Sequence, residues 1–188
     1  MRPLIVTEFV SLDGVMEAPG GEPGYAHSGW VADYFSDELG RYKGEEQDAA
    51  ETMLLGRRTY ESFYGAWPAR SGPMADKVNT MEKFVVSASL EAIEWDTASR
   101  LGSPLADAVM ELKNRDGGPI LVPGSRTLVH ALLKDGLVDE LHLQVFPVIL
   151  GSGMRLYPDS PDRTNLELAE SRQVPNGVVL QTYRPAAA

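Results

Sequence analysis

Short apolar runs that read as strands alternate with helix-like patterns along this chain, and glycine stands at many of the crossings. Strands are expected over residues 4–10, 52–55, 84–87, 119–122 and 140–150, with a weaker one over 93–97, and helices over 34–50, 58–63, 103–116 and 124–133. This succession favours an α/β fold with a mostly parallel central sheet and helices on both faces. A length of 188 residues suits one domain, so we expect residues 1–188 to form a single domain.

The C-terminal part of the chain departs from this alternation. Two β-like runs, 166–174 and 178–183, flank the pair Asn176-Gly177. Both central residues of a tight hairpin turn adopt positive φ, so an Asn-Gly pair between two strands predicts a β-hairpin. We therefore expect the sheet to end in an antiparallel hairpin.

Composition excludes several classes of function. Asp and Glu number 27 against 17 Lys and Arg, and the resulting net charge of −10 repels nucleic acid and anionic lipid. The chain has no cysteine, which excludes disulfides, zinc–thiolate sites, iron–sulfur clusters and thiol nucleophiles. No histidine pair has metal-ligand spacing, and no apolar run approaches the ~20 residues that span a membrane. We expect a cytoplasmic protein that acts on a small molecule and binds no metal, nucleic acid or membrane.

Two strand-glycine-helix junctions carry the clearest chemical signal. The first is Gly56-Arg57-Arg58-Thr59, and the second is Gly124-Ser125-Arg126-Thr127. Glycine lets the backbone approach a phosphate closely, and the N–H groups of the following helix point at it. Taken alone, the first junction is better explained as a helix start with solvated arginines. Two such junctions at the ends of parallel strands favour a dinucleotide, although neither matches Gly-x-Gly-x-x-Gly or a Walker loop.

Several short motifs occur in an order that resembles one family. They are Ser11-Leu12-Asp13-Gly14, Leu55-Gly56-Arg57-Arg58-Thr59-Tyr60-Glu61, Lys83-Phe84-Val85-Val86-Ser87, Val122-Pro123-Gly124-Ser125 and Phe146-Pro147-Val148-Ile149-Leu150-Gly151-Ser152-Gly153. Together they resemble the dihydrofolate reductase-like family, in the branch that includes the C-terminal reductase domain of riboflavin biosynthesis proteins. The resemblance covers almost the whole chain. The zinc deaminase domain of those riboflavin proteins has no counterpart here, because its signature requires cysteines.

This resemblance implies an NADPH-dependent reductase that transfers hydride to a small flat heterocycle of the pyrimidine or pteridine type. The implied cofactor-binding residues are Phe9, Val10, Met16, Gly56, Arg57, Arg58, Thr59, Ser87, Ser89, Gly124, Ser125, Arg126 and Thr127. The first three would border the nicotinamide, and the two serines after the third strand would lie near the adenosine ribose. A 2′-phosphate is held by guanidinium donors, whereas a bare ribose hydroxyl prefers an acid, so the two arginines of the first junction favour NADPH.

The resemblance also implies a carboxylate that protonates the substrate. Asp33 is the best counterpart, with Asp37 or Glu38 as alternatives, because Asp33 lies farther from Gly56 in sequence than the matching pair in dihydrofolate reductase. Asp13 is the second acid of interest, as a turn-forming residue or a substrate contact.

Two further substrate contacts are implied, and each has a simpler reading. Trp30 could stack on a flat ring or pack in the core, and Gln144 could face the substrate or be hydrogen-bonded locally. Two other functions also remain open: a dinucleotide-binding protein without catalysis, and a relative that uses a flavin in the same cleft. The run from Val145 to Leu150 is more apolar than a half-exposed strand requires, and members of the riboflavin branch pair through this region, so we expect a homodimer.

Overall fold

The computed structural model describes residues 1–157 and 163–186, and the chain forms two compact units. The first unit comprises Met1–Val6 and Lys43–Val138, and the second comprises Thr7–Tyr42 and Asp139–Ala188. Strand β1 (Leu4–Ser11) and helix α1 (Asp37–Ala49) contribute residues to both. Hydrogen bonds join the eight strands of the described residues in the order β4-β3-β2-β5-β1-β6-β8-β7. The single domain expected from the sequence stays a prediction.

Parallel strands form the sheet of the first unit. They are the start of β1, β2 (Thr52–Gly56), β3 (Glu82–Val86), β4 (Ala98–Arg100) and β5 (Ile120–Val122). Every residue of β2 and β5 is buried. Near-continuous apolar runs of this kind fit strands that are covered on both faces.

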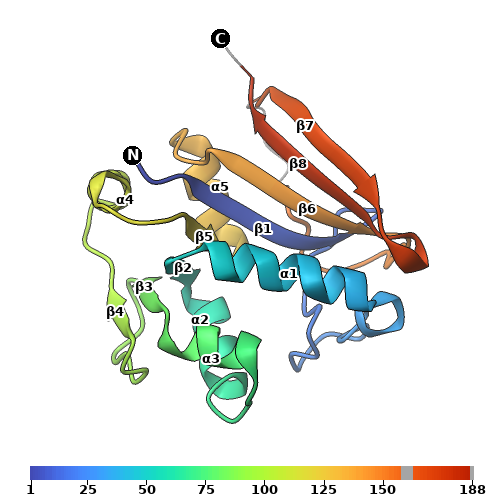
Figure 1. Ribbon diagram of the computed structural model, residues 1–188, viewed down its shortest axis with the longest axis horizontal. Coiled ribbons are helices and arrows are strands. Elements are labelled where there is room, and N and C mark those ends of the chain that lie inside the picture. The colour runs from blue at the N-terminus through green and yellow to red at the C-terminus, as the bar shows by residue number, and fades with distance from the viewer. Residues whose placement is uncertain (158–162, 187–188) are drawn as a thin grey trace. The chain divides into compact units, whose positions relative to one another are not determined.

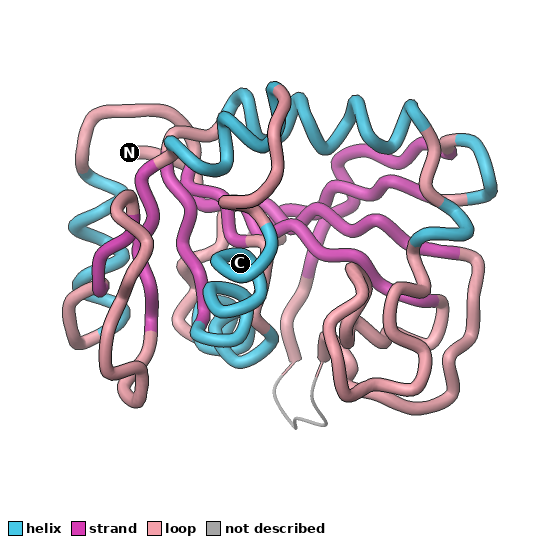
Figure 2. Tube along the Cα trace, turned by 90° about the horizontal axis from the view of Figure 1, so that it is seen from below, coloured by secondary structure: helices cyan, strands magenta, loops and turns pink. Residues whose placement is uncertain are grey.

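Helices cover both faces of the sheet (Figure 2). They are α2 (Arg57–Ala66), α3 (Pro73–Thr80), α4 (Leu105–Asn114) and α5 (Arg126–Lys134), together with the end of α1. Met53, Leu55 and Val85 pack with Tyr60 of α2 and Val78 of α3 in one buried cluster. Residues next to these in the strands, such as Phe84, point to the opposite face of the sheet. There Arg115, the C-cap of α4, lies over the Phe84 ring.

The first unit differs from the sequence expectations at three places. The fourth strand is Ala98–Arg100 and not 93–97, because the N–H groups of Glu94 and Trp95 donate to Tyr60 Oη at 2.9 and 3.3 Å instead of to a strand. Helix α3 was not expected; it begins directly after Gly72, whose φ of +109° turns the chain. The helix expected over 103–116 is shorter, since α4 begins at Leu105 with Pro104 as its N-cap and no side-chain hydrogen bond at the cap.

The second unit ends in three antiparallel strands, with β8 between β6 and β7. Strands β6 (Glu140–Phe146), β8 (Val179–Pro185) and β7 (Leu166–Gln173) lie side by side (Figure 1). The turn between β7 and β8 contains a short 3₁₀ helix, η2 (Pro175–Gly177), in which Asn176 and Gly177 have φ of +64° and +78°. The expected hairpin is confirmed, and with it the mixed, mostly parallel α/β fold.

Strand β6 is shorter than the expected 140–150. It ends at Phe146 because Pro147 has no N–H to give to a neighbouring strand. Beyond Phe146 the backbone forms hydrogen bonds with the loop that follows β1. Leu12 N donates to the Val148 carbonyl at 2.8 Å, and Leu150 N donates to the carboxylate of Asp13 at 3.1 Å.

Candidate functional site

The two predicted phosphate-binding junctions meet in the first unit. Gly56 is the N-cap of α2, and Ser125 is the N-cap of α5. A Cβ atom built on Gly56 would lie 1.9 Å from Ser125 Oγ and 3.2 Å from Ser125 N. Because β2 and β5 are parallel neighbours, with Thr52 opposite Ile120, their carboxyl ends reach the same edge of the sheet. Two helix N-termini therefore open at one place.

The electrostatics of this place suit an anion. No side chain among the described residues caps α2 or α5 with a hydrogen bond, so their first N–H groups are not consumed by a cap. Neither first turn contains an acidic residue, and Arg57, Arg58 and Arg126 lie in them. The positive ends of two helix dipoles and nearby guanidinium groups attract phosphate. Gly124 is buried with φ of +94°, a conformation that glycine adopts without strain.

Arg57 is held beside the loop that follows β3. Its Nη1 donates to Ser89 Oγ at 2.9 Å, and its Nε donates to Glu61 Oε1 at 2.8 Å. Both members of the Arg57–Glu61 pair are about half exposed, at 50% and 44% of their side-chain area. A guanidinium and a hydroxyl at hydrogen-bond distance form a pair of donors that fits a phosphate group.

The remaining predicted cofactor residues of this unit fall on the same turns. Ser87 Oγ accepts the N–H groups of Ser89 and Leu90 at 3.2 and 3.0 Å, so its hydroxyl shapes the loop. Thr59 is half-buried in the first turn of α2, and Thr127 is exposed in the first turn of α5.

Aromatic rings dominate the predicted substrate side, which lies in the second unit. Phe9, Trp30 and Tyr34 stand edge-on to the buried Phe146, with ring centroids 5.4, 5.2 and 6.0 Å away. Trp30 is 7% exposed, and its Nε1 donates to the Glu17 carbonyl at 2.9 Å. These contacts give Trp30 a packing role, and its contact with substrate stays a prediction.

Two further predicted residues lie on β1 and β6. Val10 is buried, and Gln144 is fully buried, with its Nε2 donating to Thr7 Oγ1 at 3.3 Å. A buried amide held by a neighbouring strand matches the local reading of Gln144. Its contact with substrate is not tested by this geometry.

Asp13 joins two loops of the second unit. Its Oδ1 accepts from Ser11 Oγ at 2.6 Å and from Leu150 N at 3.1 Å, and its Oδ2 accepts from Gly151 N at 2.9 Å. The Ser11 hydroxyl and these amides outweigh burial and lower the pKa of Asp13 from 3.8 to about 2. Asp13 therefore forms a turn and anchors the residues that follow β6.

Glu17 repeats this arrangement, and the sequence reasoning missed it. Its Oε2 accepts Met154 N at 2.7 Å, beside the backbone bond of 2.9 Å from Met16 N to the Met154 carbonyl. Its position at the start of a Pro/Gly-rich loop is the only sequence signal that could have indicated an anchoring role. Met16, the residue predicted to border the nicotinamide, thus lies on a loop that is anchored at both Met16 and Glu17.

The candidate proton donors lie in and after a short 3₁₀ helix, η1 (Ala32–Tyr34). Asp33 is exposed on it, Asp37 is exposed in the first turn of α1, and Glu38 Oε1 accepts from Arg172 Nη1 at 3.1 Å. The assignment of the proton donor to Asp33 stays a prediction.

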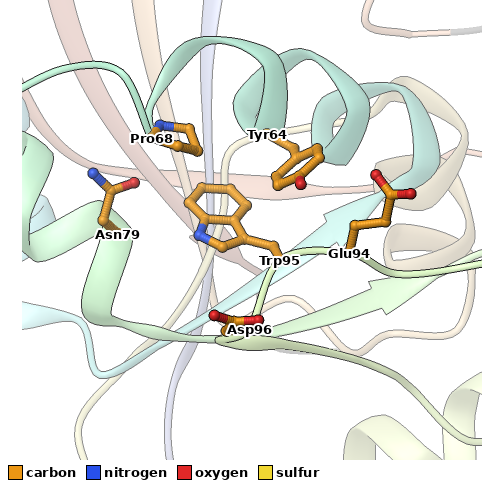
Figure 3. A pocket seen from close by; sticks show the side chains of 6 residues that line it. All are labelled: Tyr64, Pro68, Asn79, Glu94, Trp95 and Asp96. Atoms are coloured by element: carbon orange, nitrogen blue, oxygen red, sulfur yellow. The ribbon is translucent and has the colours of Figure 1, made fainter.

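A separate hollow of about 360 Å³ lies on the first unit, away from the two junctions in sequence. Figure 3 shows the Trp95 ring at its centre, with Pro68 and Tyr64 above and Asp96 below. Glu94 and Asp96 line it and would repel phosphate. Among residues 1–157 and 163–186, no group of three or more acidic or histidine side chains could hold a metal ion, and no helix is long and apolar enough to cross a membrane.

Fold and sequence comparisons define the class of protein. Dihydrofolate reductase from Enterococcus faecalis, solved with NADP(H), superposes with a TM-score of 0.65 over 98% of this chain and 97% of its own, at 14% identity. A crystal structure from Shewanella sp. PV-4, described as "Putative riboflavin biosynthesis protein", superposes with a TM-score of 0.78 over 99% of this chain and 100% of its own, at 20% identity. The fold is thus dihydrofolate reductase-like.

Within that class the family is defined by sequence. The model of the RibD C-terminal domain matches residues 2–180, so the chain belongs to the RibD C-terminal domain family. YyaP of Bacillus subtilis (strain 168), an uncharacterized protein, is 28% identical over 190 aligned residues, which cover 97% of this chain and 94% of YyaP. The resemblance expected from the motifs is confirmed, and the family supports a reductase-type function.

Proposed function

We propose that this protein is an NADPH-dependent reductase that transfers hydride to a small flat heterocycle of the pyrimidine or pteridine type, related to riboflavin or folate intermediates. The contact of Gly56 with Ser125 carries the proposal, because it brings two uncapped helix N-termini together. Arg57, bonded to Ser89, adds a guanidinium and a hydroxyl beside them. The residues present therefore fit a dinucleotide with a phosphate on its adenosine ribose.

The two junctions of the first unit have defined parts in binding. The N–H groups at the start of α2 and α5 bind the pyrophosphate, and Gly124 lets the backbone approach it. Arg57, Arg58 and Ser89 hold the 2′-phosphate. Bound NADPH would supply the hydride, so the chain needs no dense catalytic cluster of its own.

The second unit would supply the surroundings of the reacting rings in this proposal. Phe9, Val10 and Met16 border the nicotinamide, and the aromatic cluster around Phe146 keeps water away from flat rings. Trp30 and Gln144 contact the substrate. Asp33 donates the proton that completes the reduction, as its carboxyl group can reach water on the exposed side of η1.

A dinucleotide-binding protein without catalysis is the second candidate. The observation that favours it is the state of the two acids: Asp13 is committed to loop hydrogen bonds, and Asp33 is exposed to solvent. Neither acid is thus a buried, positioned proton donor of the kind that protonates a substrate ring.

Binding and turnover separate these functions. Thermal-shift and calorimetric titrations with NADPH, NADH, FMN, folates and pyrimidine intermediates come first, since a ligand at 100 times its Kd stabilises by about 2.7 kcal/mol. NADPH oxidation is then followed with each heterocycle. Binding and oxidation support the reductase, and binding without oxidation of any heterocycle supports the second candidate. Yellow protein with bound FMN would point to the flavin-using relative, and no response to NADPH would refute the proposal.

A further inference from the structure

The loop after β3 is the part of the first unit that presents Ser89 to Arg57. It runs from Ser87 to Leu90, and Ser89 is exposed on it. The Ser89 hydroxyl accepts from Arg57 Nη1 at 2.9 Å. The position of this loop therefore decides whether a hydroxyl stands beside the guanidinium.

Hydrogen bonds close this loop from two directions. From within, Ser87 Oγ accepts the N–H groups of Ser89 and Leu90 at 3.2 and 3.0 Å. From the side, Arg100 donates through Nη1 to the Ser87 carbonyl and through Nη2 to the Leu90 carbonyl. One planar guanidinium thus spans the two ends of the loop, as its rigid fork permits and a single ammonium group does not.

The backbone of Arg100 is fixed independently of its side chain. Arg100 is the last residue of β4 and lies opposite Val85 of β3. The next residue, Leu101, donates its N–H to the Val85 carbonyl at 3.0 Å. Removing the guanidinium therefore leaves the β3–β4 pairing intact and releases only the loop.

The exposure of the loop limits what these bonds contribute to folding. Ala88, Ser89 and Arg100 are exposed, so water can replace each bond at small cost in global stability. The larger effect is on the mobility of the loop. Without the Arg100 guanidinium the loop samples more conformations, so a ligand that binds only one of them binds more weakly.

We propose that Arg100 is a positioning residue for recognition of the adenosine 2′-phosphate, acting by holding Ser89 against Arg57. This inference rests on the proposed function, because it assigns selectivity at that same cofactor site. Arg100 itself is committed to two carbonyl oxygens and acts through the loop. NADPH, which carries the phosphate, depends on this order, and NADH does not.

Two variants separate position from charge. Arg100→Lys keeps the positive charge but loses the fork, and Arg100→Ala loses both. If position matters, both variants weaken NADPH by about fivefold and leave NADH within about twofold of wild type. Arg115→Ala is the matched control, since Arg115 is a partly exposed guanidinium of the same unit that lies over Phe84 and pairs with Glu111.

The experiment is calorimetric titration of NADPH and NADH into the full chain and each variant, together with amide hydrogen exchange of Ser89 and Leu90 without ligand. We expect a lower NADPH:NADH affinity ratio and faster exchange in Arg100→Lys, with neither change in Arg115→Ala. Wild-type selectivity or unchanged exchange in Arg100→Lys would overturn the role of Arg100 while the proposed function stands. Failure of the wild-type chain to bind NADPH would overturn the proposed function and this role together.

Discussion

Gly56 and Ser125 are packed so closely that a Cβ atom on Gly56 would lie 1.9 Å from Ser125 Oγ and 3.1 Å from Ser125 Cβ. Gly56 ends β2 and Ser125 follows β5, and these adjacent parallel strands are separated in the chain by three helices and two strands. The absence of a side chain at Gly56 is thus a condition for the two helix N-termini to open at one place. It is a requirement of space, since the φ of Gly56 is −73°, which any residue can adopt.

Gly56→Ala should damage the stability of the fold and the binding of dinucleotide together. Forcing a methyl group into this contact costs about 1–3 kcal/mol of unfolding free energy, because one of the two turns must move. Ser125→Gly removes the opposing side chain, so the double variant should recover much of the loss. Gly65→Ala is the control, as nothing lies within 4 Å of a Cβ there. Urea unfolding and NADPH titration measure both effects, and a fully stable Gly56→Ala variant would contradict the contact.

Arg57→Ala should reduce NADPH affinity by one to two orders of magnitude and leave NADH almost unchanged. A charge-assisted hydrogen bond contributes about 1.5–3 kcal/mol, and only NADPH carries the phosphate that Arg57 and Ser89 would hold. Thermal stability should barely change, because an exposed pair such as Arg57–Glu61 contributes little. Arg70→Ala, which removes an arginine over Trp67, serves as the control. Equal losses for both dinucleotides would show that Arg57 does not recognise the phosphate.

Local sequence patterns predicted the elements of the site better than the contacts between them. Strand-glycine-helix junctions were visible at Gly56 and Gly124, and Asn176-Gly177 indicated the hairpin, because each depends on neighbouring residues alone. The contact of Gly56 with Ser125 depends on strand order, which no local pattern contains. The bond from Gly151 N to Asp13 joins residues 138 positions apart and was equally out of reach.

Lys83 shows how burial can oppose a local pattern. Lysine side chains are mostly solvated, yet the side chain of Lys83 is fully buried. Its Nζ donates to the Met81 carbonyl at 2.6 Å and to Thr97 Oγ1 at 2.9 Å, and it lies 4.1 Å from the centre of the Trp95 ring. Only the three-dimensional neighbours explain a lysine there, since charged groups are buried only when they are paired with acceptors.

The stability of the protein should depend on Lys83 at alkaline pH. Burial lowers the pKa of Lys83 from 10.5 to about 8 in the folded state. Between those values the folded protein releases a proton that the unfolded chain keeps, so unfolding free energy rises with pH in this window. The unfolding free energy of the wild type, minus that of Lys83→Met, should rise by about 2–3 kcal/mol from pH 7.5 to 10. Urea unfolding at each pH measures it. Lys77→Met, at a partly exposed lysine on α3, is the control variant.

Asp13 should make the second unit sensitive to acid. Its pKa is about 2 in the folded state against 3.8 for the free group, so its stabilisation is present above about pH 4 and is lost as the pH falls toward 2. Asp13→Asn should lower the unfolding free energy by about 2 kcal/mol at pH 7, because hydrogen bonds to a charged acceptor are weakened. That difference should shrink at pH 2.5. Asp33→Asn, at an exposed acid, should leave stability unchanged, and an identical effect of both variants would contradict the anchoring role of Asp13.

The protein should be a homodimer whose interface includes the apolar segment that follows β6. Ile149 is 73% exposed in the single chain, within the run from Val145 to Leu150, and an apolar side chain so exposed is readily covered by a second copy. Light scattering at micromolar concentration should give a mass near twice 20.5 kDa. Ile149→Lys should shift the mass toward the monomer because it would bury a charge at the interface, whereas Met110→Lys, at an exposed residue of α4, should not. A wild-type mass near 20.5 kDa would rule out the dimer.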